Sequence, residues 1–226
     1  MGIDLEPLWL TLELALSTTV ILLVIGVPLA SYLAFRSFRM KSVVEAIISL
    51  PLVLPPTVLG FYFLLAFSPG NAFGKMLESV FDIRLIFTFS GLIAGSVIYS
   101  LPFMVHPIQA GLQGLPTSLK EASYTLGKSK TETLFKVLLP NIKPALLTGI
   151  VLSFAHTIGE FGVVLMIGGS IPGQTKVASI AIYDEVEALN YSAAHFYSFL
   201  LLIVSFSILL LVFIINKRLI RRGQNL

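Results

Sequence analysis

The sequence has no cysteine and little charge. Charged residues make up 12% of its 226 positions, against about 25% in an average soluble domain. Without cysteine, a disulfide scaffold, a thiolate zinc site and a cysteine nucleophile are all excluded. The only histidines, His106, His156 and His195, are far apart in the chain, and we predict no metal site.

Apolar residues are abundant instead. They make up 56% of the chain, with a mean hydropathy of +0.92, which is more than an average soluble domain carries. A membrane helix needs about 20 mostly apolar residues, and five such runs predict spans at about 8–35, 46–67, 85–105, 145–167 and 196–215. The runs do not alternate as barrel strands do. We therefore predict an all-α integral membrane protein, forming one transmembrane domain over residues 1–226.

Lysine and arginine are distributed unevenly between the connecting segments. Twelve of the fifteen follow the first span, lie between the third and fourth spans, or follow the fifth. Because short loops rich in basic residues stay in the cytoplasm, we predict the N-terminus outside and the C-terminus in the cytoplasm. The net charge of +3 then reflects topology, and we expect no nucleic acid as a partner.

The largest predicted cytoplasmic segment covers residues 109–143. Pro116 is typical of the first turn of a helix and Gly127 of the residue after its end, so a short helix is predicted between them. Ser129 and Glu132 fit a capping box that starts a second helix, and we expect Pro140 and Pro144 to end it. The segment is either a solvated hairpin joining two spans or a helix offered to a cytoplasmic partner.

This segment resembles the EAA loop of ABC-importer permeases. The family pattern is Glu-Ala-Ala, three residues, Gly, nine residues, Ile, one residue, Leu-Pro. Here Glu121 and Ala122 are followed by Ser123 in place of alanine, then by Gly127, by Val137 in place of isoleucine, and by a Leu-Pro pair ending at Pro140. Residues 50–60 and 159–173 narrow the resemblance to molybdate permeases and their sulfate-permease relatives, and the five spans favour molybdate or tungstate.

The resemblance implies a type I importer permease fold in a bacterial inner membrane, and it implies the partners. These are a second copy of the chain in a homodimer, two cytoplasmic ABC ATPase subunits that hold ATP and Mg, and a periplasmic or lipid-anchored oxyanion-binding protein. The chain itself would be no enzyme and would carry no cofactor. The helix over residues 116–126 would couple it to the ATPase, and the expected coupling residues are Leu119, Glu121, Ala122, Ser123, Leu126, Gly127 and Pro140.

A translocation path or gate is expected where two spans carry unusual residues. Prolines remove backbone donors and interrupt a helix, and the second span contains Pro51, Pro55, Pro56 and Thr57. This interruption is either a packing kink or a broken segment lining the path. The fourth span contains His156, Gly159, Glu160 and Gly162.

Intramembrane ionisable residues usually face the bundle interior or a cavity. A proton relay through His156 and Glu160 is one interpretation. A bare carboxylate would repel a doubly charged oxyanion, which favours Glu160 as a structural or gate-side residue. Ser100, Ser153 and Thr157 are further candidate donors for an anion, and the pair Gly91 and Gly95 is typical of helix packing.

Two other classes of function stay open at this stage. A secondary carrier or channel would need no ATP, but such carriers often show internal repeats, and five spans do not divide into two equal halves. A membrane enzyme would need a convergent acid, base or metal set, which only His156 and Glu160 approach.

Overall fold

The structure is a computed structural model that describes residues 4–223, with side chains up to residue 216. Four of the predicted cytoplasmic cations, Lys217, Arg218, Arg221 and Arg222, lie outside the described side chains. Between residues 4 and 223 the regular elements are all helical.

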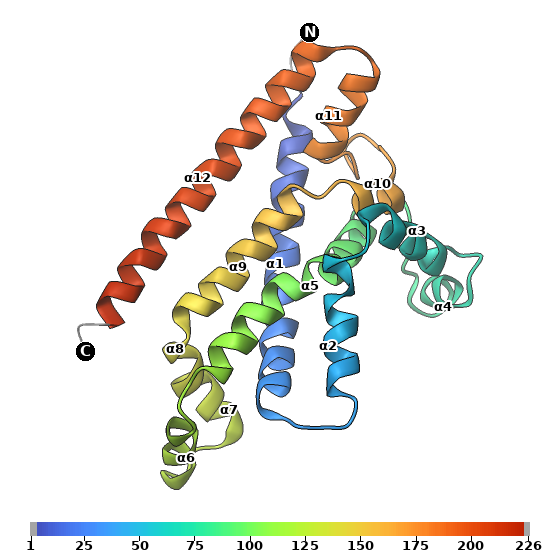
Figure 1. The fold of residues 1–226 in the computed structure, drawn as a ribbon. Helices are drawn as coiled ribbons and strands as arrows, with labels where there is room; N and C mark the ends of the chain where they lie inside the picture. Colours follow the sequence, from blue (N-terminus) through green and yellow to red (C-terminus); the bar gives the residue numbers. More distant parts are fainter. Residues whose placement is uncertain (1–3, 224–226) are drawn as a thin grey trace.

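The first half of the chain contains α1 (Glu6–Phe35), α2 (Lys41–Ser49), a 3₁₀ turn (Leu50–Leu52), α3 (Pro56–Phe67), α4 (Ala72–Phe81) and α5 (Phe89–Gln113). The second half contains α6 (Thr117–Thr125), α7 (Lys130–Thr133), a π turn (Leu134–Leu138), α8 (Leu139–Asn141), α9 (Lys143–Ile158), α10 (Gly162–Gly168), α11 (Ala178–Glu187) and α12 (Tyr191–Gly223). Figure 1 shows α1, α5, α9 and α12 as the long elements of the molecule.

Among the described residues, three helices are long and apolar enough to cross a membrane alone. They are α1, α5 and the Tyr191–Asn216 part of α12, and they confirm the first, third and fifth predicted spans with shifted ends. The count reaches five only if two bent pairs of helices are each taken as one span. The prediction of about five spans therefore matches the upper end of what the described residues allow.

The second predicted span, 46–67, is interrupted, as its prolines predict. The segment Lys41–Leu52 meets α3 at 110°, and α3 extends sideways from the bundle (Figure 1). Pro55 and Pro56 cause the break, because neither has an N–H to continue the ladder and Pro55 has an extended backbone, with ψ 137°.

The fourth predicted span, 145–167, is broken as well, which the sequence did not predict. Its helix α9 ends at Ile158, and α10 begins only at Gly162. At the other end, the segment Lys130–Asn141 meets α9 at 85°. The helical segment that begins at Lys130 ends at Asn141, between Pro140 and Pro144 as predicted, and Pro144 lies in the first turn of α9, where its missing N–H costs nothing.

The core of the bundle lies between α1, α5 and α9. Met104 of α5 is fully buried at their meeting point. A Cβ added to Gly26 of α1 would lie 2.8 Å from Met104 Cγ, and one added to Gly149 of α9 would lie 3.1 Å from the Met104 carbonyl oxygen. Glycine at these two positions lets the three helix backbones approach closely, as in membrane bundles generally.

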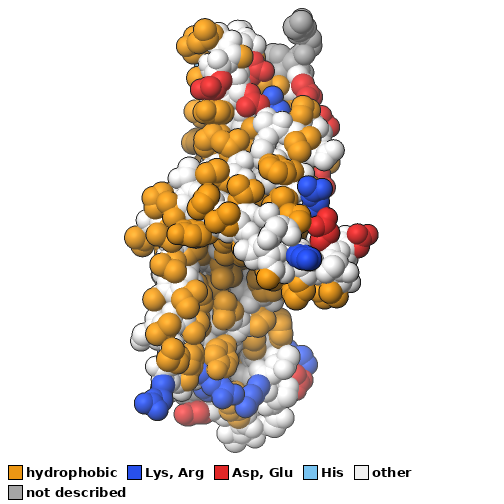
Figure 2. Space-filling model, turned by 90° about the vertical axis from the view of Figure 1, so that its right-hand side faces the viewer, with side chains coloured by type: hydrophobic (Ala, Val, Ile, Leu, Met, Phe, Trp, Pro, Cys, Tyr) orange, Lys and Arg blue, Asp and Glu red, His pale blue; other side chains and the backbone are white. Residues whose placement is uncertain are grey.

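Charge is concentrated at the ends of the molecule. Figure 2 shows many hydrophobic side chains along the middle, basic side chains gathered at the end that carries α6 and α7, several acidic side chains at the opposite end, and a mixed group of basic and acidic side chains halfway along one side. The positive-inside rule predicts that the basic end lies in the cytoplasm.

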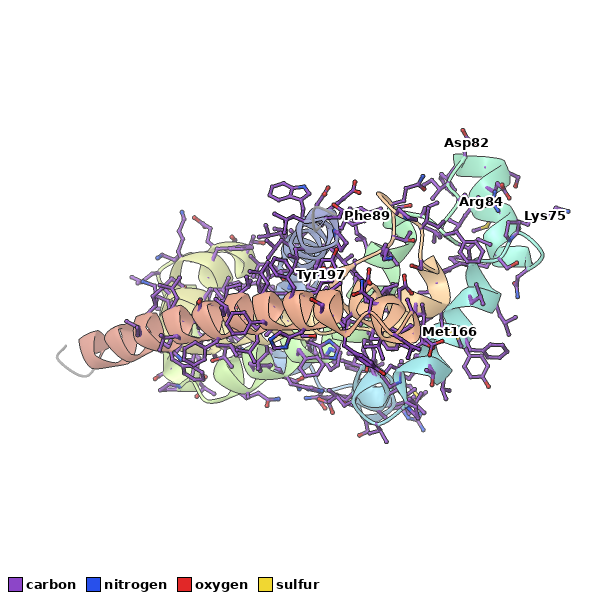
Figure 3. All side chains as sticks on the ribbon, turned by 90° about the horizontal axis from the view of Figure 1, so that it is seen from above. Lys75, Asp82, Arg84, Phe89, Met166 and Tyr197 are labelled. Carbon is purple, nitrogen blue, oxygen red and sulfur yellow. The ribbon has the colours of Figure 1, made fainter. Side chains whose placement is uncertain are left out.

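One element was not predicted. The amphipathic helix α4 begins after Asn71, whose side chain accepts a hydrogen bond from the Phe73 N–H at 3.3 Å. It continues the sideways extension of α3, and Figure 3 shows Lys75, Asp82 and Arg84 at the edge of the molecule in this region.

Candidate functional site

A cavity of about 440 Å³ lies where the two broken segments meet. Pro56 and Thr57 contribute from the start of α3, Tyr99 from α5, and the remaining lining residues come from the end of α9 and the break after it: Ala155, His156, Gly159, Glu160, Phe161 and Gly162. Residues from the second and fourth predicted spans, about 100 positions apart, thus share one cavity.

The starts of α3 and α10 are in direct contact beside this cavity. A Cβ added to Gly162 would lie 2.7 Å from Pro56 Cβ and 3.2 Å from the Thr57 nitrogen. One turn further along α3, a Cβ added to Gly60 would lie 2.8 Å from Met166 Cβ. Glycine is therefore needed at both positions for α3 and α10 to pack, whereas Gly159 has no neighbour closer than 3.8 Å and is not required for this contact.

Glu160 connects three elements around the break. It is 4% exposed, and its Oε2 accepts a hydrogen bond from Ser96 Oγ of α5 at 2.8 Å. Its backbone carbonyl accepts another from Ser179 Oγ of α11 at 2.6 Å. Its Oε1 has no hydrogen-bond partner among the described residues, although the side chain lines the cavity. The side chain is thus anchored on one oxygen and unsatisfied on the other.

His156 is held by a separate set of contacts. Its Nδ1 is 2.9 Å from Ser100 Oγ, and its ring lies between Tyr99 and Phe103, with centroid distances of 4.7 and 4.1 Å. Among the described residues no hydrogen bond joins His156 to Glu160. Because α9 ends at Ile158, the two residues do not share one helix face, and the arrangement has no direct relay between them.

The structure brings together only part of the predicted path. Pro56, Thr57, His156, Gly159, Glu160 and Gly162 line the cavity, whereas Pro51 and Pro55 do not. The candidate donors Ser100, Ser153 and Thr157 are buried but do not line the cavity, and Thr157 Oγ1 is 3.2 Å from Ser100 Oγ. The sequence interpretation missed Ser96 and Ser179, yet Ser96 precedes Ser100 by one helical turn, and this repeat of small polar residues in an apolar span was a usable signal.

Six of the predicted coupling residues lie at the basic end, on α6 and the turn after it, and the seventh, Pro140, lies on α8. Glu121, Ala122, Leu126 and Gly127 are exposed, and Leu126 has an exposed fraction of 78%. Leu119 is half-buried. Within the part of the chain that the structure describes, Glu121 takes part in no ion pair. An exposed leucine and an unpaired carboxylate leave this surface open to another protein.

Two residues fix the shape of this hairpin. Gly127 has φ +75°, the left-handed conformation that favours glycine, as its predicted place after the helix requires. Ser123 is buried, and its Oγ is 2.9 Å from Thr133 Oγ1, which joins α6 to α7. The serine that replaces the family's alanine therefore makes a specific contact.

The predicted capping box at Ser129 and Glu132 is confirmed. Lys136 Nζ donates to Glu132 Oε1 at 2.9 Å, and this bond, together with the Ser129 N–H, lowers the pKa of the Glu132 carboxyl. The start of the second helix of the hairpin is thus defined by local contacts within one turn.

Comparison with known proteins places this arrangement in a family. Residues 26–223 match the family described as "Binding-protein-dependent transport system inner membrane component". The chain is 45% identical over 206 residues to the molybdenum transport system permease protein ModB of Azotobacter vinelandii, covering 91% of each chain. It is 34% identical over 201 residues to the sulfate transport system permease protein CysT of Escherichia coli, covering 89% of this chain and 71% of that one. These relatives confirm the resemblance seen in the sequence.

Solved structures confirm the fold. The chain superimposes on the MetNI methionine ABC transporter in an inward-facing conformation with a TM-score of 0.73 at 19% identity, covering 96% of both chains. A bacterial alginate ABC transporter, solved with a pentasaccharide-bound periplasmic protein, gives a TM-score of 0.70 at 19% identity and covers 96% of this chain and 83% of that one. At these identities the likeness shows a shared fold, that of a multi-pass ABC-importer permease.

Proposed function

Because the chain belongs to the family of binding-protein-dependent transport system inner membrane components, we propose that it passes molybdate or tungstate through the bacterial inner membrane. The observation that supports molybdate as the substrate is the 45% identity to a molybdenum permease over nearly the full length of both chains. The energy comes from ATP bound by a separate subunit.

The proposed assembly has three kinds of partner. Two ATPase subunits, which carry ATP and Mg, contact the basic end, and a periplasmic or lipid-anchored binding protein delivers the oxyanion to the opposite end. The basic end of the molecule (Figure 2) supports this orientation. The exposed surface of α6, with Leu126 and the unpaired Glu121, supports a docking contact at that end. A groove on the ATPase that covers α6 would bury apolar surface which this chain leaves in water.

A homodimer is the second part of the proposal. Within the most apolar part of α12, none of the residues is buried in the single chain, and Phe199, Leu202 and Phe206 are among the large exposed apolar side chains. Lipid covers part of this surface, and a second copy of the chain covers the rest, so that two chains enclose a central path.

The gate of that path is the contact between α3 and α10. Both helices begin at the cavity, and Thr57 offers a hydroxyl donor there, whereas the Glu160 carboxylate, which also lines the cavity, opposes a resting anion. No lysine or arginine is among the described residues that line the cavity. The cavity therefore has no positively charged side chain that would bind an oxyanion tightly. This arrangement suits rapid passage, with substrate selection left to the binding protein.

Glu160 has a structural role in this gate. Its hydrogen bonds to Ser96 and Ser179 hold the break between α9 and α10 against α5 and α11. A ligand role is disfavoured because an ionised carboxylate repels a doubly charged oxyanion. ATP-driven closure of the ATPase pair would shift the α6–α7 hairpin. The 85° junction with α9 would pass this movement along α9 to the break between α9 and α10.

Sulfate import is the second candidate, because several relatives that match at 31–34% identity are sulfate permeases. Uptake by proteoliposomes that contain the chain, its ATPase and the loaded binding protein, with ATP inside, distinguishes the two. We expect labelled molybdate to enter and a tenfold excess of sulfate to leave its rate unchanged. Uptake of labelled sulfate, with competition by sulfate against molybdate, would contradict the molybdate proposal.

A further inference from the structure

A second cavity, of about 670 Å³, lies at the basic end between α1, α6 and the α7 region. Three of its lining residues are cations, Arg36, Lys120 and Lys130, and none of the described residues that line it is acidic. The three ion pairs found among the described residues involve Lys41, Lys136 and Lys176, so the cavity's cations are not neutralised within the described chain. A cavity of this charge favours an anion.

Aromatic rings hold two of these cations at the end of α1. The Arg36 guanidinium carbon lies 5.9 Å from the centre of the Tyr32 ring, and Lys120 Nζ lies 4.7 Å from the centre of the Phe35 ring. Tyr32 and Phe35 are themselves exposed. Aromatic residues beside cations at the end of a span are typical of the headgroup region of a membrane.

The surface that continues from this cavity along α1 is apolar and exposed. Ile21, Ile25 and Tyr32 follow one another at helical spacing on one face of α1, and all three are exposed. Pro28, between Ile25 and Tyr32, lines the cavity. A molecule with its anionic group in the cavity would thus have a hydrophobic track leading away from it toward the middle of the bilayer.

We propose that this cavity binds the phosphodiester headgroup of an anionic phospholipid, with the acyl chains lying along the exposed face of α1. The three cations supply the charge for the phosphate, and the track on α1 supplies contacts that a free inorganic oxyanion does not use. The placement in the cytoplasmic leaflet rests on the orientation given under the proposed function. Basic pockets between helix ends on the cytoplasmic side suit anionic lipid headgroups on charge grounds.

The occupied cavity would also link α1 to the coupling hairpin. Lys120 belongs to α6 and Lys130 begins α7, whereas Arg36 follows the last residue of α1. A phosphate bridging these cations would restrain the hairpin relative to the membrane. Anionic lipid is therefore expected to affect how the ATPase drives the chain.

The test measures lipid retained by the complete transporter, purified with its ATPase from nanodiscs that contain equal parts phosphatidylglycerol and phosphatidylcholine. Native mass spectrometry counts bound phosphatidylglycerol for the wild type, for Arg36→Gln with Lys130→Gln, and for a matched control, Arg39→Gln with Lys143→Gln. The control removes the same charge from the same end, at two exposed residues that do not line the cavity. We expect the cavity variant to retain at least fivefold less phosphatidylglycerol than the wild type and the control.

Equal retention in all three proteins would overturn the proposal. So would release of the lipid by millimolar phosphate or molybdate at constant ionic strength, which would identify a site for free oxyanions. If the cavity variant does not assemble, the wild type is crosslinked with a photoreactive phosphatidylglycerol and the labelled residues are identified. Labelling of residues 28–36 and 120–138 supports the site, and labelling elsewhere alone contradicts it. These readouts need no transport, so failure of molybdate uptake would count against the proposed function and not against the lipid site.

Discussion

The contact between α3 and α10 makes Gly162→Ala the sharpest test of the gate geometry. The added methyl group would lie 2.7 Å from Pro56 Cβ and 3.2 Å from two backbone atoms of residues 56 and 57. A proline ring and backbone cannot move aside as a flexible side chain can. Overpacking of this kind costs about 1–3 kcal/mol, against a gain of about 0.5–1 kcal/mol from replacing glycine by alanine in a helix.

Gly159→Ala is the matched control, because it adds the same methyl group three residues earlier. Its φ is −88° and its nearest neighbour would be 3.8 Å away. Thermal unfolding of the purified transporter should show a lower Tm for Gly162→Ala, by about 2–4 °C for each net kcal/mol in a chain of this size. We also expect slower molybdate uptake from Gly162→Ala, while Gly159→Ala keeps the Tm of the wild type. Equal Tm values and uptake rates for both variants would refute the argument that α3 and α10 close against each other at Gly162.

Three further predictions concern the hairpin and the break. Gly127→Val forces a branched side chain into φ +75°, which costs about 1–3 kcal/mol of backbone strain. We expect this variant to insert normally into the membrane but to lose co-purification with the ATPase. Full transport by the variant would count against coupling through α6. Ser123→Ala leaves the Thr133 hydroxyl without its partner and should weaken ATP-driven uptake, whereas an unchanged rate would show that this bond is dispensable. Glu160→Gln keeps an acceptor for Ser96 and should retain uptake, whereas Glu160→Leu should lose it; loss in both variants would favour a proton relay.

Long apolar runs and local capping signals were predictable from the sequence. Helix α1 occupies Glu6–Phe35 where the run predicts 8–35, because length and hydropathy alone define such a span. The capping box at Ser129 and the positive φ of Gly127 follow from contacts within one turn. The break before Pro56 was expected from its prolines, but its 110° bend depends on packing against α10, which no local pattern encodes.

The break after Ile158 was not predictable from apolar periodicity. Residues 145–167 form one hydrophobic run, and what divides it is a set of distant partners: Ser96 and Ser179 on Glu160, and Pro56 on Gly162. The third predicted span ended at residue 105, which is too early, because its prolines do not end the helix. This helix continues to Gln113 through Pro102 and Pro107, because Ile108 and Leu112 are buried in the bundle core, and tertiary packing outweighs the local preference of proline.

The most direct test of the account is the ATP dependence of molybdate uptake. Proteoliposomes carry the complete transporter and the loaded binding protein, with either ATP and Mg or a non-hydrolysable ATP analogue enclosed with the ATPase. We predict uptake of labelled molybdate above background only with hydrolysable ATP. Equal uptake with the analogue, or with no nucleotide, would contradict an ATP-driven permease and identify a secondary carrier or channel.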